Sequence, residues 1–289
     1  MTEEEYKAEW KLGFHQTDYN NCRFAEDKVQ YCKDWIDKHC KDYHGYYLSD
    51  VCRMVCDQKI KIATDANYRA LCQDWSDKIN ARAMLINEGM ENLSIPTLTD
   101  RYDNIRVQDL MNLDQSKPYI VKCNHGSGWN KTKTETNSVN TIQRDIRAWQ
   151  NLNYAYIAGY EAQYENIKPG FLVQPILCDK PIDYGFWYVQ GELQNISLTK
   201  KYGKNLEEYL AFVKPDCTAS KFYIGMQPEI GDLQPKFAYA AQTLREYTDQ
   251  LSKPFDFVRV DMFYVNKTPY FGEMTFTPCA GRIEVMYKR

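Results

Sequence analysis

The chain has 289 residues, of which 44% are hydrophobic and 26% are charged, and its formal net charge is −3 at pH 7. The composition fits a globular protein, and the length fits one large multilobed domain or two ordinary ones. A slightly acidic chain has no basic excess to neutralise phosphates along a strand, which argues against a dedicated nucleic-acid binder. No apolar run reaches the roughly 18 residues of a membrane span, and the acidic start MTEEEYKAEWK is unlike a signal peptide, so we expect a cytoplasmic protein.

The N-terminal third of the chain is expected to be largely helical. Residues 24–40 have mixed helical periodicity, and a clearer helix is predicted to begin after Thr64-Asp65, a pair suited to an N-cap. Gly89 offers its end, because glycine commonly follows the last turn of a helix. Apolar residues at spacings of three and four give this helix one apolar stripe. The stripe consists of Tyr68, Leu71, Cys72, Trp75, Ile79, Ala83 and Ile86.

Most of the cysteines also lie near the N-terminus, beside three histidines. No CxxC occurs among them, and their spacings match no common zinc finger or ribbon. We therefore expect reduced thiols that pack in the interior. A zinc-binding interaction domain at residues 15–56 is the alternative, and it predicts stoichiometric metal. The residues concerned are Cys22, Cys32, Cys40, Cys52, Cys56 and Cys72, with His15, His39 and His44.

Short apolar runs beyond residue 98 predict strands. The last two runs flank Gln190-Gly191-Glu192, which suggests a hairpin turn. Helices are expected from about Val139 to Leu152 and from about Gln234 to Leu251, with Pro235 in the first turn of the second. Strands and helices are interspersed without regular βα alternation, so α+β is the predicted fold class. The apolar runs are residues 119–123, 171–177, 186–190 and 193–199.

The stretch PYIVKCNHGSGWNKT at 118–132 is the first candidate for a binding site. A predicted strand ends on Lys122 and opens into Gly126-Ser127-Gly128. Backbone N–H groups of such a loop can wrap a phosphate while the lysine supplies a point charge. The stretch is neither a Walker A loop nor a GxGxxG fingerprint. A glycine-rich turn without a ligand is therefore the alternative.

The second candidate is VRVDMFYVNKTPYFGEMTF at 258–276, which reads as two antiparallel strands joined by a turn at NKTP. Successive side chains of a strand alternate between faces, so Arg259 and Asp261 share one face, as do Glu273 and Thr275 on the return strand. Folding at the turn can pair Asp261 with Glu273. Magnesium suits such paired carboxylates, and Arg259 suits the charge of a transferring phosphoryl group. The alternative is a solvated polar face.

Three passages resemble the ATP-grasp superfamily, and within it the TupA-like branch, which is named for a teichuronopeptide-biosynthesis protein and associated with bacterial surface polysaccharide clusters. They are SDKINARAMLINEGMENLSIPTL at 76–98, VKCNHGSGWN at 121–130 and FDFVRVDMFYVNKTPYFGEMTFTPCAG at 255–281. The similarity spans about residues 55–289.

The resemblance implies an ATP-grasp fold, α+β in class, in which two lobes clasp ATP, with a largely helical N-terminal region. Residues 1–98 would form this helical region and contribute a phosphate-binding lysine. Residues 99–178 would form a small lobe with the Gly/Ser loop, and residues 179–289 a large lobe with the magnesium-binding hairpin.

The resemblance also implies a set of ATP-binding residues. Two lysines resemble those that reach the nucleotide phosphates, and the Gly/Ser loop resembles the one that closes over the triphosphate. A hinge strand contacts adenine, and an acidic side chain binds the ribose. The implied residues are Lys78, Lys122, Gly126, Ser127, Gly128, Gln174, Pro175, Leu177, Asp183 and Lys201.

By the same resemblance Asp261, Glu273 and Thr275 hold Mg²⁺. The expected catalytic residues are Arg259, which would steady the transferring phosphate, the phosphate-binding Lys122, and Arg282. Arg282, just after the hairpin, is a candidate for holding a substrate carboxylate bidentately, and its alternative is a surface ion pair with Glu284.

Three positions depart from the family pattern. Gln174 stands where the family carries Glu, and Thr275 where a third metal ligand is usually Asn. Gly185 follows Asp183-Tyr184 where the branch commonly has Lys, so one basic contact is either missing or supplied by Lys200 or Lys201.

The implied reaction is an ATP-dependent carboxylate–amine ligation. ATP phosphorylates a carboxylate, an amine attacks the acyl phosphate, and an amide forms, with ATP and Mg²⁺ required. The polysaccharide association suggests a uronic-acid carboxyl on a sugar nucleotide or glycan, joined to an amino acid or small amine. The alternatives are an amino-acid or peptide ligase acting on a non-sugar acceptor and a nucleotide-binding module without turnover.

Overall fold

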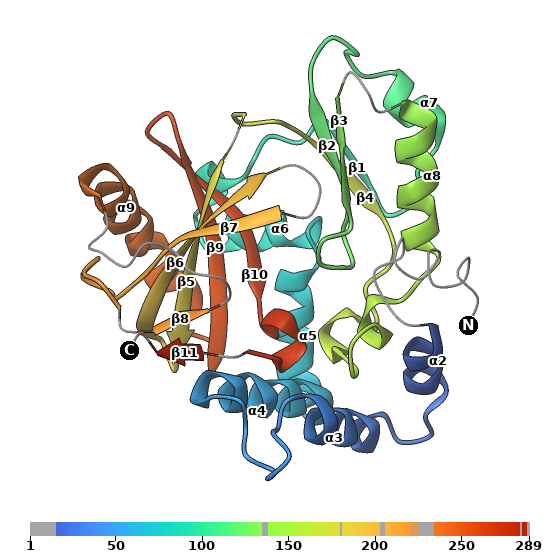
Figure 1. Cartoon of the computed structure of the whole chain (residues 1–289). Helices are drawn as coiled ribbons and strands as arrows, with labels where there is room; N and C mark the ends of the chain where they lie inside the picture. Colours follow the sequence, from blue (N-terminus) through green and yellow to red (C-terminus); the bar gives the residue numbers. More distant parts are fainter. Residues whose placement is uncertain are drawn as a thin grey trace. The chain divides into compact units, whose positions relative to one another are not determined.

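The computed structural model describes residues 16–134, 138–179, 181–202, 206–220, 222–224, 234–283 and 285–287 (Figure 1). For residues 200–202, 206–211, 222–224 and 285–287 it describes the backbone alone. Backbone contacts divide the chain into two compact units. Unit 1 comprises Met1–Lys38, Lys59–Ala83 and Pro96–Ile176, and unit 2 comprises His39–Gln58, Met84–Ile95 and Leu177–Arg289. The functional domain limits at residues 98 and 178 stay a prediction.

The N-terminal third is helical. Asp65 caps the first turn of α5, because its carboxylate accepts hydrogen bonds from the N–H groups of Asn67 and Tyr68. No helix of the described residues is long and apolar enough to cross a membrane. The elements are α2 (Gln16–Phe24), α3 (Lys28–His39), α4 (Asp50–Thr64), α5 (Ala66–Ser76), α6 (Asn80–Asn87) and a 3-10 turn, η1 (Glu91–Leu93).

The single helix predicted after Asp65 is wrong in one respect, because the chain breaks it into α5 and α6. The carboxylate of Asp77 accepts from the N–H of Ile79 at 2.9 Å and of Asn80 at 3.4 Å. A side chain that occupies these donors starts a new helix instead of continuing the old one. The predicted apolar stripe ends at the same point: Ala83 is exposed, and Ile86 is 61% exposed.

Unit 1 contains a four-stranded sheet of order β1-β4-β2-β3. The strands predicted at 119–123 and 171–177 are confirmed as β2 and β4, the second ending at Pro175. The elements are β1 (Thr99–Arg101), α7 (Val107–Met111), β2 (Tyr119–Cys123), β3 (Asn130–Lys133), α8 (Val139–Gln150), the 3-10 turns η2 (Tyr154–Tyr156) and η3 (Ala162–Tyr164), and β4 (Phe171–Pro175).

Helix α8 covers one face of this sheet (Figure 1). Burial alternates along β2, and its buried residues pack with those of α8 in one apolar cluster. Because strand side chains alternate, Ile120 and Lys122 point to the opposite face. The shared cluster includes Tyr119, Val121 and Cys123 of β2, Ile142, Ile146 and Trp149 of α8, and Phe171 and Val173 of β4.

Unit 2 contains a five-stranded antiparallel sheet of order β10-β9-β5-β6-β7. The predicted β5–β6 hairpin is confirmed, and its turn residues Gln190 and Gly191 have φ of 50° and 77°, as a two-residue hairpin turn requires. A separate pair joins β8 to β11. The elements are β5 (Ile182–Val189), β6 (Glu192–Tyr202), β7 (Leu206–Val213), β8 (Phe222–Ile224), α9 (Pro235–Ser252), β9 (Phe257–Val265), β10 (Thr268–Thr275), the 3-10 turn η4 (Pro278–Gly281) and β11 (Val285–Tyr287).

Helix α9 packs on one face of the five-stranded sheet (Figure 1). The hydroxyl of Tyr188 on β5 donates to Asp249 of α9 at 2.6 Å and lies 2.8 Å from the Thr248 hydroxyl. Tyr188 pairs with Val258 across to β9, so the even-numbered side chains of β9 face the helix. Its odd-numbered side chains, Arg259 and Asp261 among them, therefore lie on the other face of the sheet.

Candidate functional site

The junction between α5 and α6 presents Asp77 and Lys78 in unit 1. Besides its helix-capping bonds, the Asp77 carboxylate accepts from the Asn124 amide and the Tyr102 hydroxyl, each at 3.0 Å. Burial raises the pKa of Asp77, and these hydrogen bonds oppose that shift. Because four donors hold the Asp77 carboxylate, the backbone next to it, which carries the Lys78 side chain, is fixed in position.

Asn124 connects this junction to the loop behind β2. Its amide also donates to the Lys168 carbonyl at 3.0 Å and accepts from the Gly170 N–H at 2.7 Å, and its own carbonyl accepts from the Lys78 N–H at 3.2 Å. Asn124 is fully buried. It is absent from the sequence-based predictions, although it stands between the strand-ending lysine and the Gly/Ser loop. The signal in the sequence that could have identified Asn124 is a polar residue placed where an apolar strand ends.

The structure brings Lys78 to the Gly/Ser loop, because its ammonium donates to the Gly126 carbonyl at 2.6 Å. The two glycines of the loop have different roles. A Cβ at Gly126 would lie 2.7 Å from the Trp129 ring and 2.8 Å from the Tyr154 ring, so no side chain fits there. Gly128 has φ of 70° and open space around its Cα, so the backbone conformation requires glycine there.

Lys122 and Gln174 share the sheet face opposite α8. Across the β2–β4 ladder, Ile120 pairs with Gln174 and Lys122 pairs with Leu172. Gln174 is buried, and its Oε1 has no hydrogen-bond partner among the described residues. A buried carbonyl oxygen without a donor fits a ligand that supplies an N–H, such as the amino group of adenine. Pro175 ends β4, and the half-buried Leu177 follows it.

His125 is a packing residue of this loop. It is buried, and its ring meets the edge of Trp129 with the centroids 5.4 Å apart. Burial lowers the pKa of His125 to about 4, and the nearby Lys78 ammonium adds to this effect. The imidazole is therefore neutral near pH 7 and a weak base.

In unit 2 the predicted β9–β10 hairpin is confirmed, with Glu273 opposite Asp261 and Thr275 opposite Arg259. Its turn is narrower than predicted: Asn266 and Lys267 have φ of 52° and 65°, and Pro269 already belongs to β10, an edge strand. The register shifts between Phe271 and Glu273.

Gly272 forms this bulge. A Cβ there would lie 2.8 Å from the Asp261 carbonyl oxygen. The bulge moves Glu273 onto the face that Asp261 occupies, and only glycine fits so close to the neighbouring backbone.

The Asp261 carboxylate is buried and bound at both oxygens. Arg259 donates to Oδ1 through Nε and to Oδ2 through Nη2, each at 2.6 Å, and the Thr275 hydroxyl donates to Oδ2 at 3.3 Å. Burial alone would lower the pKa of Arg259, but the carboxylates of Asp261, Asp183 and Glu273 have the larger effect. The pKa of Arg259 therefore lies above the usual value for arginine. One guanidinium thus faces three carboxylates, and this excess of oxygen ligands fits a hard divalent cation such as Mg²⁺.

Gly185 lies directly opposite Asp261, on the neighbouring strand. A Cβ at this position would lie 2.6 Å from the Ser197 hydroxyl and 3.1 Å from Asp261 Oδ1. The Ser197 hydroxyl is fixed in turn, because it accepts from the Trp187 indole N–H at 2.9 Å. The departure from the family pattern thus has a local reason: with Ser197 present, a lysine at position 185 has no room.

The remaining predicted residues are less informative. Arg282 is exposed and directly follows η4. The backbone of Lys200 pairs with Ile182, but the side chains of Lys200 and Lys201 lie outside those that the structure describes. Ser127 lies within the Gly/Ser loop and is half-buried.

A cavity of about 600 Å³ opens on the same face of the unit 2 sheet as Arg259. Trp187 lines it and pairs with Arg259 across the β5–β9 ladder, with the guanidinium 5.4 Å from the indole ring centre. The opposite wall comes from the start of α4 and the segment before it. The lining includes Tyr46, Tyr47, Arg53, Trp187, Asn195 and Phe212.

The lysine-ended strand with its Gly/Ser loop and the hairpin that bears Arg, Asp and Glu are thus both present, as the resemblance to ATP-grasp proteins predicts. The chain belongs to the TupA-like ATP-grasp family, whose model, described as "TupA-like ATPgrasp", matches residues 59–289. The predicted family and the α+β ATP-grasp fold class are therefore confirmed. A search of the curated proteins finds no match to the chain.

Among solved structures the chain is similar to an L-amino acid ligase from Bacillus licheniformis, with 14% identity, 86% of this chain and 55% of that chain covered, and a TM-score of 0.48. It is also similar to a D-alanine–D-alanine ligase from Bacillus anthracis complexed with ATP (14% identity, 70% and 55% covered, TM-score 0.39). A D-alanine–D-alanine ligase from Helicobacter pylori gives 18% identity, 72% and 56% covered, and a TM-score of 0.42. The chain thus spans about half the length of these structures.

Proposed function

We propose that the protein is an ATP-dependent carboxylate–amine ligase that forms an amide through an acyl phosphate. The observation that carries this proposal is the β9–β10 register, which pairs Asp261 with Glu273 and Arg259 with Thr275 in a chain of the TupA-like ATP-grasp family. Carboxylates, a guanidinium and a hydroxyl on one sheet face are the groups that phosphoryl transfer needs.

The unit 1 residues bind the nucleotide in this proposal. Lys78 and Lys122 offset the charge of the ATP phosphates, and the Gly126–Gly128 loop donates backbone N–H groups to them. The Gln174 Oε1 accepts a hydrogen bond from the adenine amino group, and Pro175 and Leu177 supply backbone contacts to adenine. The Asn124 network keeps Lys78 and the loop in a fixed relation before ATP arrives, which lowers the entropy cost of binding.

The unit 2 residues serve the transferring phosphate. When bound to Asp261, Glu273 and Thr275, Mg²⁺ would offset the charge of the ATP phosphates and orient the γ-phosphate. Arg259 lies beside these residues and stabilises the phosphoryl oxygens. Asp183 holds the ribose, and the Lys201 ammonium supplies a further phosphate contact.

The reaction proceeds in two displacements. A carboxylate oxygen of the acid attacks the γ-phosphorus, the bond to the bridging oxygen of ATP breaks, and ADP leaves with its electron pair. The amine nitrogen then attacks the acyl carbon, phosphate leaves, and the nitrogen loses a proton to yield the amide. The protein contributes positive charge, orientation and exclusion of water, and it needs no side-chain nucleophile.

We further propose that the acid is a uronic-acid carboxyl of a sugar nucleotide or glycan used for bacterial surface polysaccharide, and that the amine is an amino acid or small amine. The 600 Å³ cavity beside Arg259 supports this choice, because its volume suits a small molecule and its rings suit a sugar face. Asn195 and Arg53 supply polar contacts at its wall. Arg282 is a second candidate for the substrate carboxylate.

Hydroxylamine can replace the amine and trap the acyl phosphate as a hydroxamate. The protein would be incubated with Mg·ATP, hydroxylamine and a panel of uronic-acid sugar nucleotides and amino acids, with hydroxamate and ADP read by mass spectrometry. We expect hydroxamate and ADP in equal amounts with a uronic acid. Hydroxamate from amino acids alone would overturn the sugar assignment. The absence of both ATP binding and product would overturn the ligase proposal.

The cavity can be tested separately through Arg53, whose side chain is 53% exposed and therefore tolerates truncation. We expect Arg53→Ala to raise the KM for the acid about 10-fold and to leave the KM for ATP unchanged. Arg245→Ala, on α9 at the other face of the sheet, is the matched control. Equal KM values for the acid in both variants would exclude the cavity as the acceptor site.

A further inference from the structure

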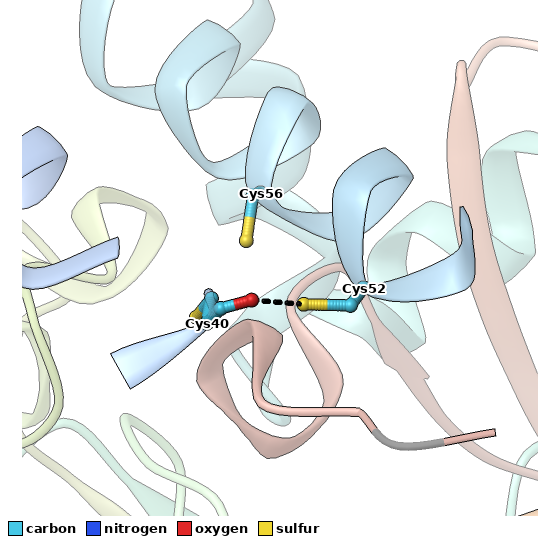
Figure 2. Close-up of side chains that lie close together, drawn as sticks. All are labelled: Cys40, Cys52 and Cys56. Atoms are coloured by element: carbon cyan, nitrogen blue, oxygen red, sulfur yellow. Dashed lines mark hydrogen bonds between the residues drawn. The ribbon is translucent and has the colours of Figure 1, made fainter. Parts of the chain in front are cut away.

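Three cysteines of unit 2 converge on one point (Figure 2). Cys40 directly follows the last residue of α3, and Cys52 and Cys56 lie one turn apart on α4. Residues four apart in a helix share a face, so both α4 thiols point toward Cys40. The three sulfur atoms lie within 4.8 Å of one another, and all three residues are fully buried.

The backbone of η4 lies against two of the sulfurs, those of Cys40 and Cys56. A Cβ at Gly281 would lie 3.1 Å from Cys56 Sγ and 3.5 Å from Cys40 Sγ, so the bare Cα of glycine approaches them closely. Cys279, Ala280 and Gly281 have successive φ of 52°, 54° and 99°, an unfavourable run that holds this backbone against the thiols.

Hydrogen bonds fix the cluster in place. The Cys52 thiol donates to the Cys40 carbonyl at 3.3 Å, and the Ser49 hydroxyl donates to the Ile283 carbonyl at 2.7 Å. The N–H of Leu48 donates to the Cys40 carbonyl at 3.1 Å. The segments that carry the three thiols are thus joined to one another independently of any ligand.

The geometry differs from that of a disulfide, because all three cysteines are free. A disulfide brings two sulfurs to about 2.05 Å and leaves the third cysteine unused. A tetrahedral zinc site with Zn–S bonds of about 2.3 Å separates its sulfurs by about 3.8 Å, which small side-chain movements reach from the observed spacing. Among the described residues, no second group of three potential ligands comes this close together.

We propose that Cys40, Cys52 and Cys56 bind Zn²⁺ through three thiolates, with a water or another external ligand in the fourth position. Binding releases the three thiol protons as three Zn–S bonds form. A set of three soft sulfur ligands selects zinc over Mg²⁺, so this site is separate from the carboxylate hairpin. Of the zinc alternative at residues 15–56, His15 lies outside the described residues. Among residues 16–56 the three cysteines are the only group of potential ligands that comes together, and their spacing C-x11-C-x3-C matches no common motif.

The site has a structural consequence for unit 2. The metal would close the loop between α3 and α4, residues 41–49, at its base. This loop supplies Tyr46, Tyr47 and Leu48 to the wall of the 600 Å³ cavity. Zinc would therefore stabilise the cavity wall, and its binding does not depend on the ligase proposal.

Metal content tests the proposal directly. The full chain would be purified under reducing conditions without chelators, reconstituted with zinc, desalted and measured by plasma mass spectrometry. We expect about one zinc per chain. Cobalt in its place should give an absorption band from thiolate-to-metal charge transfer. Less than about a tenth of an equivalent of zinc, or cobalt without that band, would overturn the proposal.

Variants identify the ligands. We expect Cys52→Ser and Cys56→Ser to lower the zinc affinity at least about 10-fold. Cys72→Ser, at an equally buried cysteine of α5 outside the cluster, should retain it. Equal zinc affinity in all three proteins would contradict the assignment.

A measurement on the unaltered chain covers the case in which those variants fail to fold. Zinc-loaded protein would be alkylated with and without a chelator, and each cysteine read by peptide mass spectrometry. We expect the chelator to speed alkylation of Cys40, Cys52 and Cys56, but not of the buried Cys123 or the exposed Cys279. No effect of the chelator, or a disulfide within the cluster, would count against a zinc site.

Discussion

Asp261 combines deep burial with two short bonds to one guanidinium, and its neighbour Glu273 shares its sheet face. We expect Asp261→Asn and Glu273→Gln each to reduce ADP formation about 100-fold or more, because each removes a negative oxygen ligand of the cation. The assay is acid-dependent ADP release at saturating Mg·ATP. Glu192→Gln, at an exposed carboxylate of β6, is the control. Full activity in either hairpin variant would exclude Mg²⁺ binding there.

His125 predicts a pH dependence of stability. Its folded pKa, about 4, lies below the usual 6.5, so the unfolded chain binds the extra proton first as the pH falls. The neutral His125 therefore contributes fully to the free energy of unfolding above pH 6.5. This contribution is lost progressively between pH 6.5 and 4, and it amounts to on the order of 3 kcal/mol.

We expect His125→Asn to flatten the unfolding free energy over this pH window. Urea denaturation at a series of pH values measures it, with His44→Asn, at an exposed histidine, as the control. Parallel curves of unfolding free energy against pH for the native chain and the His125→Asn variant would refute a pKa of about 4 for His125.

At the scale of elements, Gly272 determines which residues of β10 face Asp261. We expect Gly272→Ala to destabilise the protein by about 1–3 kcal/mol, because the new methyl group meets the Asp261 carbonyl oxygen. Activity should fall further than this stability loss explains, since Glu273 is displaced along the strand.

Gly191→Ala is the matched control for Gly272→Ala. It introduces strain at φ of 77° in the β5–β6 turn, with no atom within 4 Å of the new methyl group. This strain should lower the free energy of unfolding by about 1–2 kcal/mol and leave the activity per folded molecule unchanged. Thermal unfolding and ADP release on both variants make the comparison. Equal activity losses in the two would mean that the bulge has no specific role.

The elements that the sequence predicts well are those set by local signals. The β5–β6 and β9–β10 hairpins follow from alternation and turn residues, and α9 follows from its apolar spacing and Pro235. The break between α5 and α6 was not predicted, because it depends on how one side chain, Asp77, divides its hydrogen bonds. The role of Asn124 depends on contacts with segments distant in sequence, which its position after a strand does not identify. The three cysteines of the cluster lie close in sequence, but their spacing matches no common motif, so the sequence could not select them from the other cysteines and histidines of the zinc alternative.

At the scale of the whole molecule, ligand binding should be visible as stabilisation. We expect Mg·ATP at 100 times its Kd to raise the unfolding free energy by about 2.7 kcal/mol. Lys122→Met should remove most of this gain, measured against the ligand-free stability of the same variant. Lys117→Met, at an exposed lysine before β2, is the control. Thermal unfolding with and without Mg·ATP makes the comparison, and equal gains in both variants would exclude Lys122 as a phosphate contact.

The pairing of Arg259 with Asp261 has a consequence for the order in which ligands arrive. Both carboxylate oxygens are already occupied by a cation that belongs to the chain. A metal ion on its own must displace the guanidinium from Asp261, its closest ion-pair partner, which is costly. A metal ion that arrives with a triphosphate brings new anionic partners for Arg259. Free Mg²⁺ is therefore expected to bind poorly, and the metal and the nucleotide to enter together.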